Sequence, residues 1–158
     1  MGSDSDWNKV SLCVEVLKSF DVDVETRVIS AHRTPKTAID FAESAIDNNF
    51  GVIICAAGMA AHLAGVMAAN TTLPVIGIPL SSGAGDGLDA LLSTVQMPSG
   101  FPVATVAIDG SKNAAYLAIS ILSVDNPDLR DRIIKFRCDN AAKVLEKDKQ
   151  IAEKAALL

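Results

Sequence analysis

Ser30-Ala31-His32-Arg33-Thr34-Pro35 joins a strand-like run at residues 24–29 to a helix that begins at once. Thr34 is a residue type that caps helices, and Pro35 suits a first helical turn because its missing N–H needs no partner there. The stretch therefore brings a hydroxyl, an imidazole and a guanidinium to the carboxyl end of a strand, where open α/β sheets bind their ligands. Histidine changes its charge near neutral pH, and arginine is a preferred partner of phosphate and carboxylate groups. The sequence predicts a ligand site at this turn.

Strands alternate with helices along the rest of the chain. Apolar residues at steps of three and four predict helices, and short β-branched runs predict strands. The expected helices are 5–20, 34–49, 60–70, 88–95, 113–122 and 129–149 or beyond, and the expected strands are 22–29, 52–56, 74–78 and 103–108. This order predicts a central parallel sheet in a three-layer α/β/α sandwich, formed by a single domain of 158 residues. A composition of 49% hydrophobic but only 4% aromatic residues fits a core of small and β-branched side chains.

The bulk composition argues against several classes of function. The net charge of −5 and the lack of a basic run make nucleic acid an unsuitable partner. Cys13, Cys55 and Cys138 lie far apart and form no cluster with histidines, so neither a metal site nor a disulfide is indicated; we expect Cys55 to be an inert core residue. The apolar tract 52–69 carries His62 in its middle and predicts a strand, a turn and a helix rather than a membrane span. We expect a cytoplasmic protein without a signal peptide.

Two further stretches of small residues lie beside expected helix starts. Gly2-Ser3-Asp4-Ser5-Asp6-Trp7 leads into the first helix, where free N–H and hydroxyl groups favour an anion and Asp6 can accept hydrogen bonds from a ribose; plain helix capping is the alternative. Ala57-Gly58-Met59-Ala60-Ala61-His62-Leu63 follows a buried strand, and there His62 either faces the site or is a satisfied core residue. The loop 81–87, rich in Ser and Gly, is either a lid or a flexible connection.

Four motifs in order closely resemble those of the N5-carboxyaminoimidazole ribonucleotide mutases, the class I enzymes of purine biosynthesis. They are Gly2-Ser3-Asp4-Ser5-Asp6-Trp7, Ser30-Ala31-His32-Arg33-Thr34-Pro35, Ala57-Gly58-x-Ala60-Ala61-His62-Leu63 and Gln96-Met97-Pro98, and the similarity extends from Gly2 to about Leu122. The resemblance implies a flavodoxin-like fold and a homo-octamer in which the C-terminal helix, about 128–150, packs against a neighbouring subunit. It also implies a nucleotide substrate and a reaction without metal or organic cofactor, in which a carboxylate moves from N5 to C4 of the aminoimidazole.

The resemblance also implies a role for each motif residue. His32 would be the catalytic residue, carrying a proton between N5 and C4. Ser3, Ser30 and Arg33 would hold the 5′-phosphate, and Asp6 the ribose. The other substrate-binding residues that it implies are Ala31, Ala57, Gly58, Ala61, His62 and Leu63; Ala57, Gly58 and Ala61 among them would line the place where CO2 is held.

Two alternatives stay open. The related class II carboxylases, which use free CO2, typically have His-Lys at the place of His32-Arg33 and lack the Ala-Ala-His-Leu element, so both markers favour the mutase. A nucleotide-binding module without chemistry, such as a flavin carrier or a receiver domain, needs aromatic rings near its loops or an acidic cluster at strand ends. This sequence offers neither.

The sequence departs from the pattern of the mutases at three places. Met59 and Ala64 stand where class I members usually have Gly and Pro, and residues 109–113 replace a run richer in Gly and Ala. The mutases have a hydrophobic strand before Gly2, whereas here only Met1 precedes it, which would leave two neighbours in the sheet unpaired. We therefore expect the natural protein to begin upstream of Met1.

Overall fold

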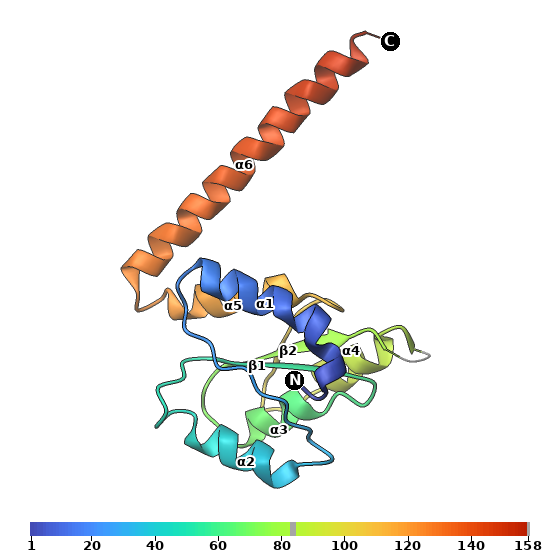
Figure 1. The fold of residues 1–158 in the computed structure, drawn as a ribbon, viewed down its shortest axis with the longest axis vertical. Helices are drawn as coiled ribbons and strands as arrows, with labels where there is room; N and C mark the ends of the chain where they lie inside the picture. Colours follow the sequence, from blue (N-terminus) through green and yellow to red (C-terminus); the bar gives the residue numbers. More distant parts are fainter. Residues whose placement is uncertain (83–84, 158) are drawn as a thin grey trace. The chain divides into compact units, whose positions relative to one another are not determined.

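The computed structural model describes residues 1–82 and 85–157 of the chain. The chain divides into two compact units, Met1–Leu122 and Ser123–Leu158. The first unit is built on a parallel sheet of three strands in the order β1 (Ile53–Gly58), β2 (Val75–Leu80) and β3 (Ala104–Thr105). Parallel strands need crossover connections. Here α3 (Leu63–Ala69) connects β1 to β2 and α4 (Leu88–Val95) connects β2 to β3, and helices cover both faces of the sheet (Figure 1).

The middle strand, β2, forms the centre of the core. All six of its residues are buried, and it pairs with β1 along its whole length and with β3 at Ile76 and Gly77. A Cβ atom at Gly77 would lie 2.3 Å from the Cγ2 atom of Thr94 in helix α4 (Leu88–Val95). Glycine is therefore required at this position, because it lets α4 pack directly on the sheet.

Helices form the outer layers of the first unit. On one side of the sheet α1 (Trp7–Ser19) packs against α5 (Ser111–Leu122), and on the other side α2 (Pro35–Ser44) packs against α3 (Leu63–Ala69) (Figure 1). The buried residues of α1 and α2 recur at three- and four-residue steps, as expected for one apolar face: Val10, Cys13 and Leu17, and Ala38 and Ala42. The first unit is the flavodoxin-like α/β/α sandwich that the sequence predicts.

Most of the expected elements are present with shifted ends. The helix expected at 34–49 ends at Ser44, and turns continue the chain to residue 49. The strand expected at 103–108 is reduced to Ala104–Thr105, because it pairs with β2 at only two positions on the edge of the sheet. The helix expected from 129 to 149 or beyond starts slightly earlier and becomes α6 (Pro127–Ala155).

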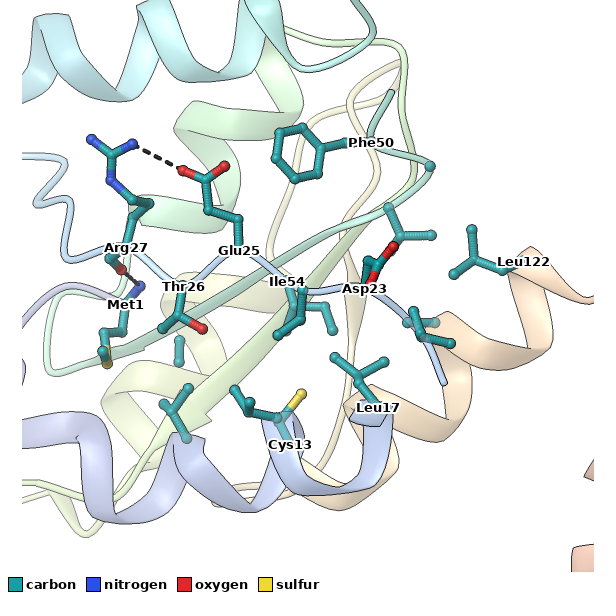
Figure 2. A pocket seen from close by; sticks show the side chains of 18 of the residues that line it. Met1, Cys13, Leu17, Asp23, Glu25, Thr26, Arg27, Phe50, Ile54 and Leu122 are labelled. Atoms are coloured by element: carbon teal, nitrogen blue, oxygen red, sulfur yellow. Dashed lines mark hydrogen bonds and ion pairs between the residues drawn. The ribbon is translucent and has the colours of Figure 1, made fainter. Parts of the chain in front are cut away.

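The prediction of a strand at residues 22–29 is wrong. Its alternating valines suit a strand, but the segment is irregular and joins no sheet within the described residues. A strand needs a neighbour that completes its ladder of hydrogen bonds, and a pocket of about 290 Å³ lies between this segment and β1. Figure 2 shows this pocket, here called the β1 groove, with Thr26 of the segment, Ile54 of β1 and Leu17 of α1 in its lining.

Met1 and Gly2 lie at one end of the β1 groove and connect its two sides. The Met1 ammonium group donates a 2.9 Å hydrogen bond to the Arg27 carbonyl (Figure 2), and the Ile29 N–H donates a 2.9 Å bond to the Met1 carbonyl. On the other side, the Gly2 N–H donates a 3.0 Å bond to the Ala56 carbonyl of β1. In a parallel strand between two neighbours, one residue bonds to one neighbour and the next residue bonds to the other. Met1 and Gly2 follow this pattern. Burial lowers the pKa of the Met1 ammonium group, so a charge at this place is unfavourable.

The second unit consists mainly of helix α6. The Asn126 side chain caps its start by accepting a 3.0 Å hydrogen bond from the Leu129 N–H, and Pro127 fits the first turn. Several large apolar side chains along the helix are exposed: Ile134, Val144, Leu145 and Ile151. Within residues 1–82 and 85–157, the helices are too short or too polar to cross a membrane.

The buried cysteines are held as neutral thiols. Burial raises the pKa of the Cys13 thiol to about 11 and that of the Cys55 thiol to about 12. Because the thiolate is the reactive form of cysteine, both side chains are inert at neutral pH. The expectation that Cys55 is an inert core residue is confirmed.

Candidate active site

The carboxyl end of β1, the turn at residues 30–34 and the amino-terminal turn meet around a pocket of about 500 Å³. This is the edge of a parallel sheet at which α/β proteins bind ligands. Nearly all residues that the motifs predict line it: Ser3, Asp6, Ser30, Ala31, His32, Arg33, Ala57, Gly58, His62 and Leu63. Ala61 is the exception and corrects the expectation, because it is 1% exposed, packs in the core and does not line the pocket.

The turn at residues 30–34 is held by hydrogen bonds within itself. The Ser30 N–H donates to the Thr34 hydroxyl at 3.0 Å, while the Thr34 hydroxyl and N–H both donate to the Ser30 carbonyl, at 3.1 and 2.9 Å. Thr34 stands at the cap position of α2, but its hydroxyl closes this turn and makes no capping bond. His32 is exposed and sits in the middle of this closed turn, which limits how far it can move.

Arg33 is tied to the amino-terminal turn. Its guanidinium donates a 2.8 Å hydrogen bond to the Gly2 carbonyl and a 3.3 Å bond to the Ser30 hydroxyl, which also accepts the Arg33 N–H at 3.2 Å. The Arg33 guanidinium thus lines the same pocket as several serine side chains, among them Ser3 and Ser30. This combination of a charged fork and neutral donors is suited to a phosphate or carboxylate.

Ser3 and Asp6 form a reciprocal cap at the first helical turn. The Ser3 hydroxyl accepts the Ser5 N–H at 3.3 Å, and the Asp6 carboxylate accepts the Ser3 N–H at 3.1 Å. The capping interpretation of this stretch is therefore confirmed. Burial raises the pKa of Asp6, and the bond from Ser3 and nearby positive charges oppose this. Both side chains also line the pocket, so capping and ligand binding are compatible here.

The two histidines of the chain meet at the rim of the pocket. His32 Nε2 and His62 Nδ1 are 2.9 Å apart, and the two rings are nearly perpendicular at 83°. His62 stands at the cap position of α3, directly after the loop that leaves β1. Of the two readings of His62, the structure supports the one in which it faces the site, because the residue is exposed and lines the pocket.

Gly58 and Met59 line the pocket where β1 ends. A Cβ atom at Gly58 would lie 2.1 Å from the Ser82 hydroxyl oxygen, so only glycine leaves room for that side chain. The Ser82 oxygen is buried and has no hydrogen-bond partner among the described residues. Met59 adopts a left-handed backbone with a φ of 55°, which explains physically why glycine suits this position.

Several pocket residues were not among the predicted site residues. They are Gly2, Ser5, Met59, Ala60 and Ser82. All but Ser82 lie inside the motifs themselves, so the motif boundaries were the available signal. Ser82 comes from the loop 81–87, whose expected role as a lid stays a prediction because residues 83 and 84 lie outside the described residues.

A polar cluster holds the loops beside the pocket together. Lys9 Nζ contacts both carboxylate oxygens of Asp109, at 2.9 and 2.8 Å, and the Ser81 carbonyl at 2.8 Å. Asp109 also accepts the Ser81 N–H at 2.9 Å and the Ser81 hydroxyl at 2.6 Å. Burial alone would raise the pKa of Asp109, but the hydrogen bonds from Lys9 and Ser81 and the charge of Lys9 outweigh it, so the pKa is lowered.

The chemistry available in the pocket is proton transfer and anion binding. Imidazole, guanidinium, hydroxyl and carboxylate groups line it. Within residues 1–82 and 85–157, no three His, Cys, Asp or Glu side chains come together in a way that could hold a metal ion. The groups present fit a substrate with an anionic end and a reacting centre near His32.

A family model and individual relatives place the sequence in the same group of proteins. The model of the AIR carboxylase family matches residues 1–143. The N5-carboxyaminoimidazole ribonucleotide mutase of Pyrococcus abyssi is 54% identical over 139 residues, which cover 88% of this chain and 80% of the relative. The protein of the same name from Mycobacterium tuberculosis is 49% identical over 158 residues, covering 100% of this chain and 91% of the relative.

The fold leads to the same group of proteins. The crystal structure of Treponema denticola PurE superposes with a TM-score of 0.85 and 29% sequence identity, covering 95% of this chain and 94% of that one. Sequence and structure agree over most of the length of both chains, including every motif that lines the pocket. The chain therefore belongs to the AIR carboxylase family.

Proposed function

We propose that this protein is an N5-carboxyaminoimidazole ribonucleotide mutase of purine biosynthesis, which converts that nucleotide into 4-carboxy-5-aminoimidazole ribonucleotide. The observation that carries the proposal is the meeting of His32, Arg33, Ser3 and Asp6 in one pocket of about 500 Å³. These groups match the three parts of the substrate, which are the reacting imidazole, the phosphate and the ribose. The names of the relatives support the same assignment.

Binding begins with the phosphate and the ribose. The Arg33 guanidinium is held at the pocket by its hydrogen bonds to the Gly2 carbonyl and the Ser30 hydroxyl. From this position it can bind a phosphate by moving its side chain alone. Ser3 and Ser30 supply hydroxyl donors, and Asp6 accepts hydrogen bonds from the ribose. Ala31, Ala57, Gly58 and Leu63 add small or apolar walls against which the base ring lies. His62 lies at the rim of the same pocket, against His32.

The carboxylate then moves in two steps. The N5–carboxylate bond breaks and releases CO2, and the protonated His32 imidazole gives its proton to N5. C4 of the ring next forms a bond to the CO2, and the neutral imidazole takes the proton that C4 loses. His32 is therefore regenerated in each turnover, and proton transfer by such a group is typically worth about 10²–10⁴ in rate. Holding CO2 beside its acceptor adds the advantage of proximity.

The alternative within the family is a class II carboxylase that uses free CO2. Arginine rather than lysine at position 33 and the Ala60-Ala61-His62-Leu63 element both favour the mutase. A pocket that keeps CO2 between the two steps transfers the original carboxylate, whereas a carboxylase takes CO2 from solution. The fate of the carboxylate carbon distinguishes the two.

An isotope experiment tests the proposal. The purified protein is given N5-carboxyaminoimidazole ribonucleotide with a ¹³C-labelled carboxylate in unlabelled bicarbonate buffer, and the product is analysed by mass spectrometry. We expect the product to retain the label. Full loss of the label, together with product formation from aminoimidazole ribonucleotide and bicarbonate, would identify a carboxylase. Absence of product from both substrates would contradict an enzyme of either class.

We further propose that the protein is a homo-octamer in which α6 packs against a neighbouring subunit. The exposed apolar side chains of α6, Ile134, Val144, Leu145 and Ile151, support an interface on this helix. Light scattering coupled to size exclusion measures the mass directly. A particle of one chain would contradict the proposal, and replacing Val144 and Leu145 by Asp should shift an octamer to smaller species.

A further inference from the structure

The contact between His32 and His62 restricts the protonation of both rings. A neutral imidazole carries one N–H and one lone pair on its two ring nitrogens. At 2.9 Å, His32 Nε2 and His62 Nδ1 form a hydrogen bond only when one of them carries a proton and the other a lone pair. The tautomer of one ring therefore determines the tautomer of the other, and the Nδ1 atom of His32 is held in the complementary state.

Both rings are carried by backbone that is fixed independently of the contact. The turn around His32 is closed by the hydrogen bonds between Ser30 and Thr34. The His62 N–H donates to the Ala60 carbonyl at 2.9 Å, and the His62 carbonyl accepts the Val66 N–H at 3.0 Å in the first turn of α3. Two fixed supports thus bring the nitrogens to hydrogen-bond distance, so little conformational entropy is lost when the bond forms.

We propose that His62 is the positioning residue of His32: its Nδ1 atom holds the His32 ring in one orientation and ties the tautomer of His32 to its own, so that the same ring nitrogen always meets the substrate. This inference rests on the proposed function for its consequence in catalysis. Its structural part does not depend on the identity of the substrate. An imidazole that exchanged tautomers freely would present the required nitrogen in the wrong protonation state for part of the time.

The structural part is tested by ¹⁵N NMR of the ring nitrogens in the protein without substrate. The chain contains only two histidines, so the spectrum contains two rings, and in the variant His62→Leu only the His32 ring remains. We expect the nitrogens of the neutral His32 ring in the wild type at the separate shifts of one tautomer. In His62→Leu they should move toward the averaged shifts of a freely exchanging ring. Unchanged His32 shifts in this variant would overturn the inference.

The catalytic part is tested with two variants of the same residue. His62→Asn keeps a polar atom that can donate or accept near the place of Nδ1, whereas His62→Leu keeps the bulk without a hydrogen bond. We expect His62→Leu to lower kcat by on the order of 10- to 100-fold, as when a partner that orients a functional imidazole is lost, with little change in KM. His62→Asn should recover most of the loss. His62 is exposed, so both variants should fold, which circular dichroism checks.

The outcomes separate this inference from the proposed function. A kcat of His62→Asn as low as that of His62→Leu would overturn positioning, because His62 would then act through its own proton or a substrate contact. A rise in KM at constant kcat in His62→Leu would also overturn it. Wild-type protein that converts neither nucleotide, but shows the expected change in the NMR spectrum, would contradict the proposed function and leave the positioning of His32 supported.

Discussion

The proposed function gives single residues around the pocket separate tasks that substitution can distinguish. It assigns His32 to the proton and Arg33 to the phosphate, although the two are adjacent in one turn. His32→Asn should abolish interconversion while the nucleotide still binds. Arg33→Ala should mainly weaken binding, by about 1.5–3 kcal/mol, as for the loss of hydrogen bonds between charged groups, because Arg33 is exposed. Calorimetric titration with product and turnover assays measure the two effects; loss of binding in His32→Asn would contradict the division of roles.

Met59 bears a local strain that glycine relieves. Its φ of 55° costs an L-residue about 1–2 kcal/mol, and its side chain is 61% exposed, so packing returns little. Glycine at this position would relieve that strain. Part of the gain in stability is lost, because glycine also raises the conformational entropy of the unfolded chain. Met59→Gly should therefore raise the free energy of unfolding by about 0.5–1 kcal/mol, as measured by urea denaturation.

The matched control for this prediction is Met59→Ala. Alanine removes the long side chain but keeps the Cβ atom that makes the left-handed conformation unfavourable. Its stability should stay close to that of the wild type. An equal gain in both variants would show that the exposed side chain, and not the backbone, is the cause.

At the scale of elements, the cluster of Lys9, Ser81 and Asp109 connects α1 to the loops that follow β2 and β3. The pKa of Asp109 is lowered in the folded protein, so the unfolded chain binds more protons at acidic pH. The stabilisation that ionised Asp109 gives to the folded protein is complete above 3.8, the ordinary pKa of an aspartate. It is lost as the pH falls through the lower pKa that Asp109 has in the folded protein. The ion pair is 36–37% exposed, so salt should reduce the effect.

Asp109→Asn tests this connection. The amide cannot titrate, so the variant should be less stable than the wild type at pH 5 and lose less stability between pH 5 and pH 3. Urea denaturation at both pH values, at low and high salt, measures the difference. Parallel stability curves for the two proteins would contradict the assigned role of Asp109.

The β1 groove shows how one element depends on its neighbour. Residues 22–29 have the alternating pattern of a strand, yet without a partner beside β1 they remain irregular. Met1 and Gly2 nevertheless make hydrogen bonds of a strand, Met1 to this segment and Gly2 to β1. The groove is lined by the apolar side chains of α1, α5 and β1, among them Leu17, Ile54 and Leu122 (Figure 2).

At the scale of the whole molecule, an extended apolar segment joined to Met1 should fill this groove. Each buried Val or Ile side chain contributes about 1.5–3 kcal/mol, which is partly offset by the ordering of the segment. A five-residue extension of alternating Val and Ile should raise Tm by about 5 °C or more. The control is a Gly/Ser extension of equal length, and equal Tm values for both extensions would contradict the prediction.

An extension at Met1 should also change how the stability of the protein depends on pH. Burial lowers the pKa of the Met1 ammonium group below 8.0, so the unfolded chain binds more protons and stability should rise with pH through this range. An amide bond at this nitrogen removes the charge. The rise in unfolding free energy between the lowered pKa and pH 8 should therefore be present in the original chain and absent from both extended forms.

Features that depend on neighbours along the chain were predictable. Helix starts, the buried stripes of α1 and α2 and the alternation of strands and helices follow from local patterns, because each needs contacts only a few residues away. Most of the pocket was predictable as well, because its residues belong to short motifs at the ends of strands. Ala61 was misplaced because a motif does not say which of its side chains turns into the core.

The sequence by itself determined the parallel α/β architecture, the place of the candidate site and most of the chemical groups that line it. Only the tertiary structure decided that residues 22–29 form no strand and that His32 lies 2.9 Å from His62, thirty positions away. Both facts depend on contacts between distant segments. A ladder needs a partner strand, and two side chains meet only where the sheet brings the ends of their segments to the same edge.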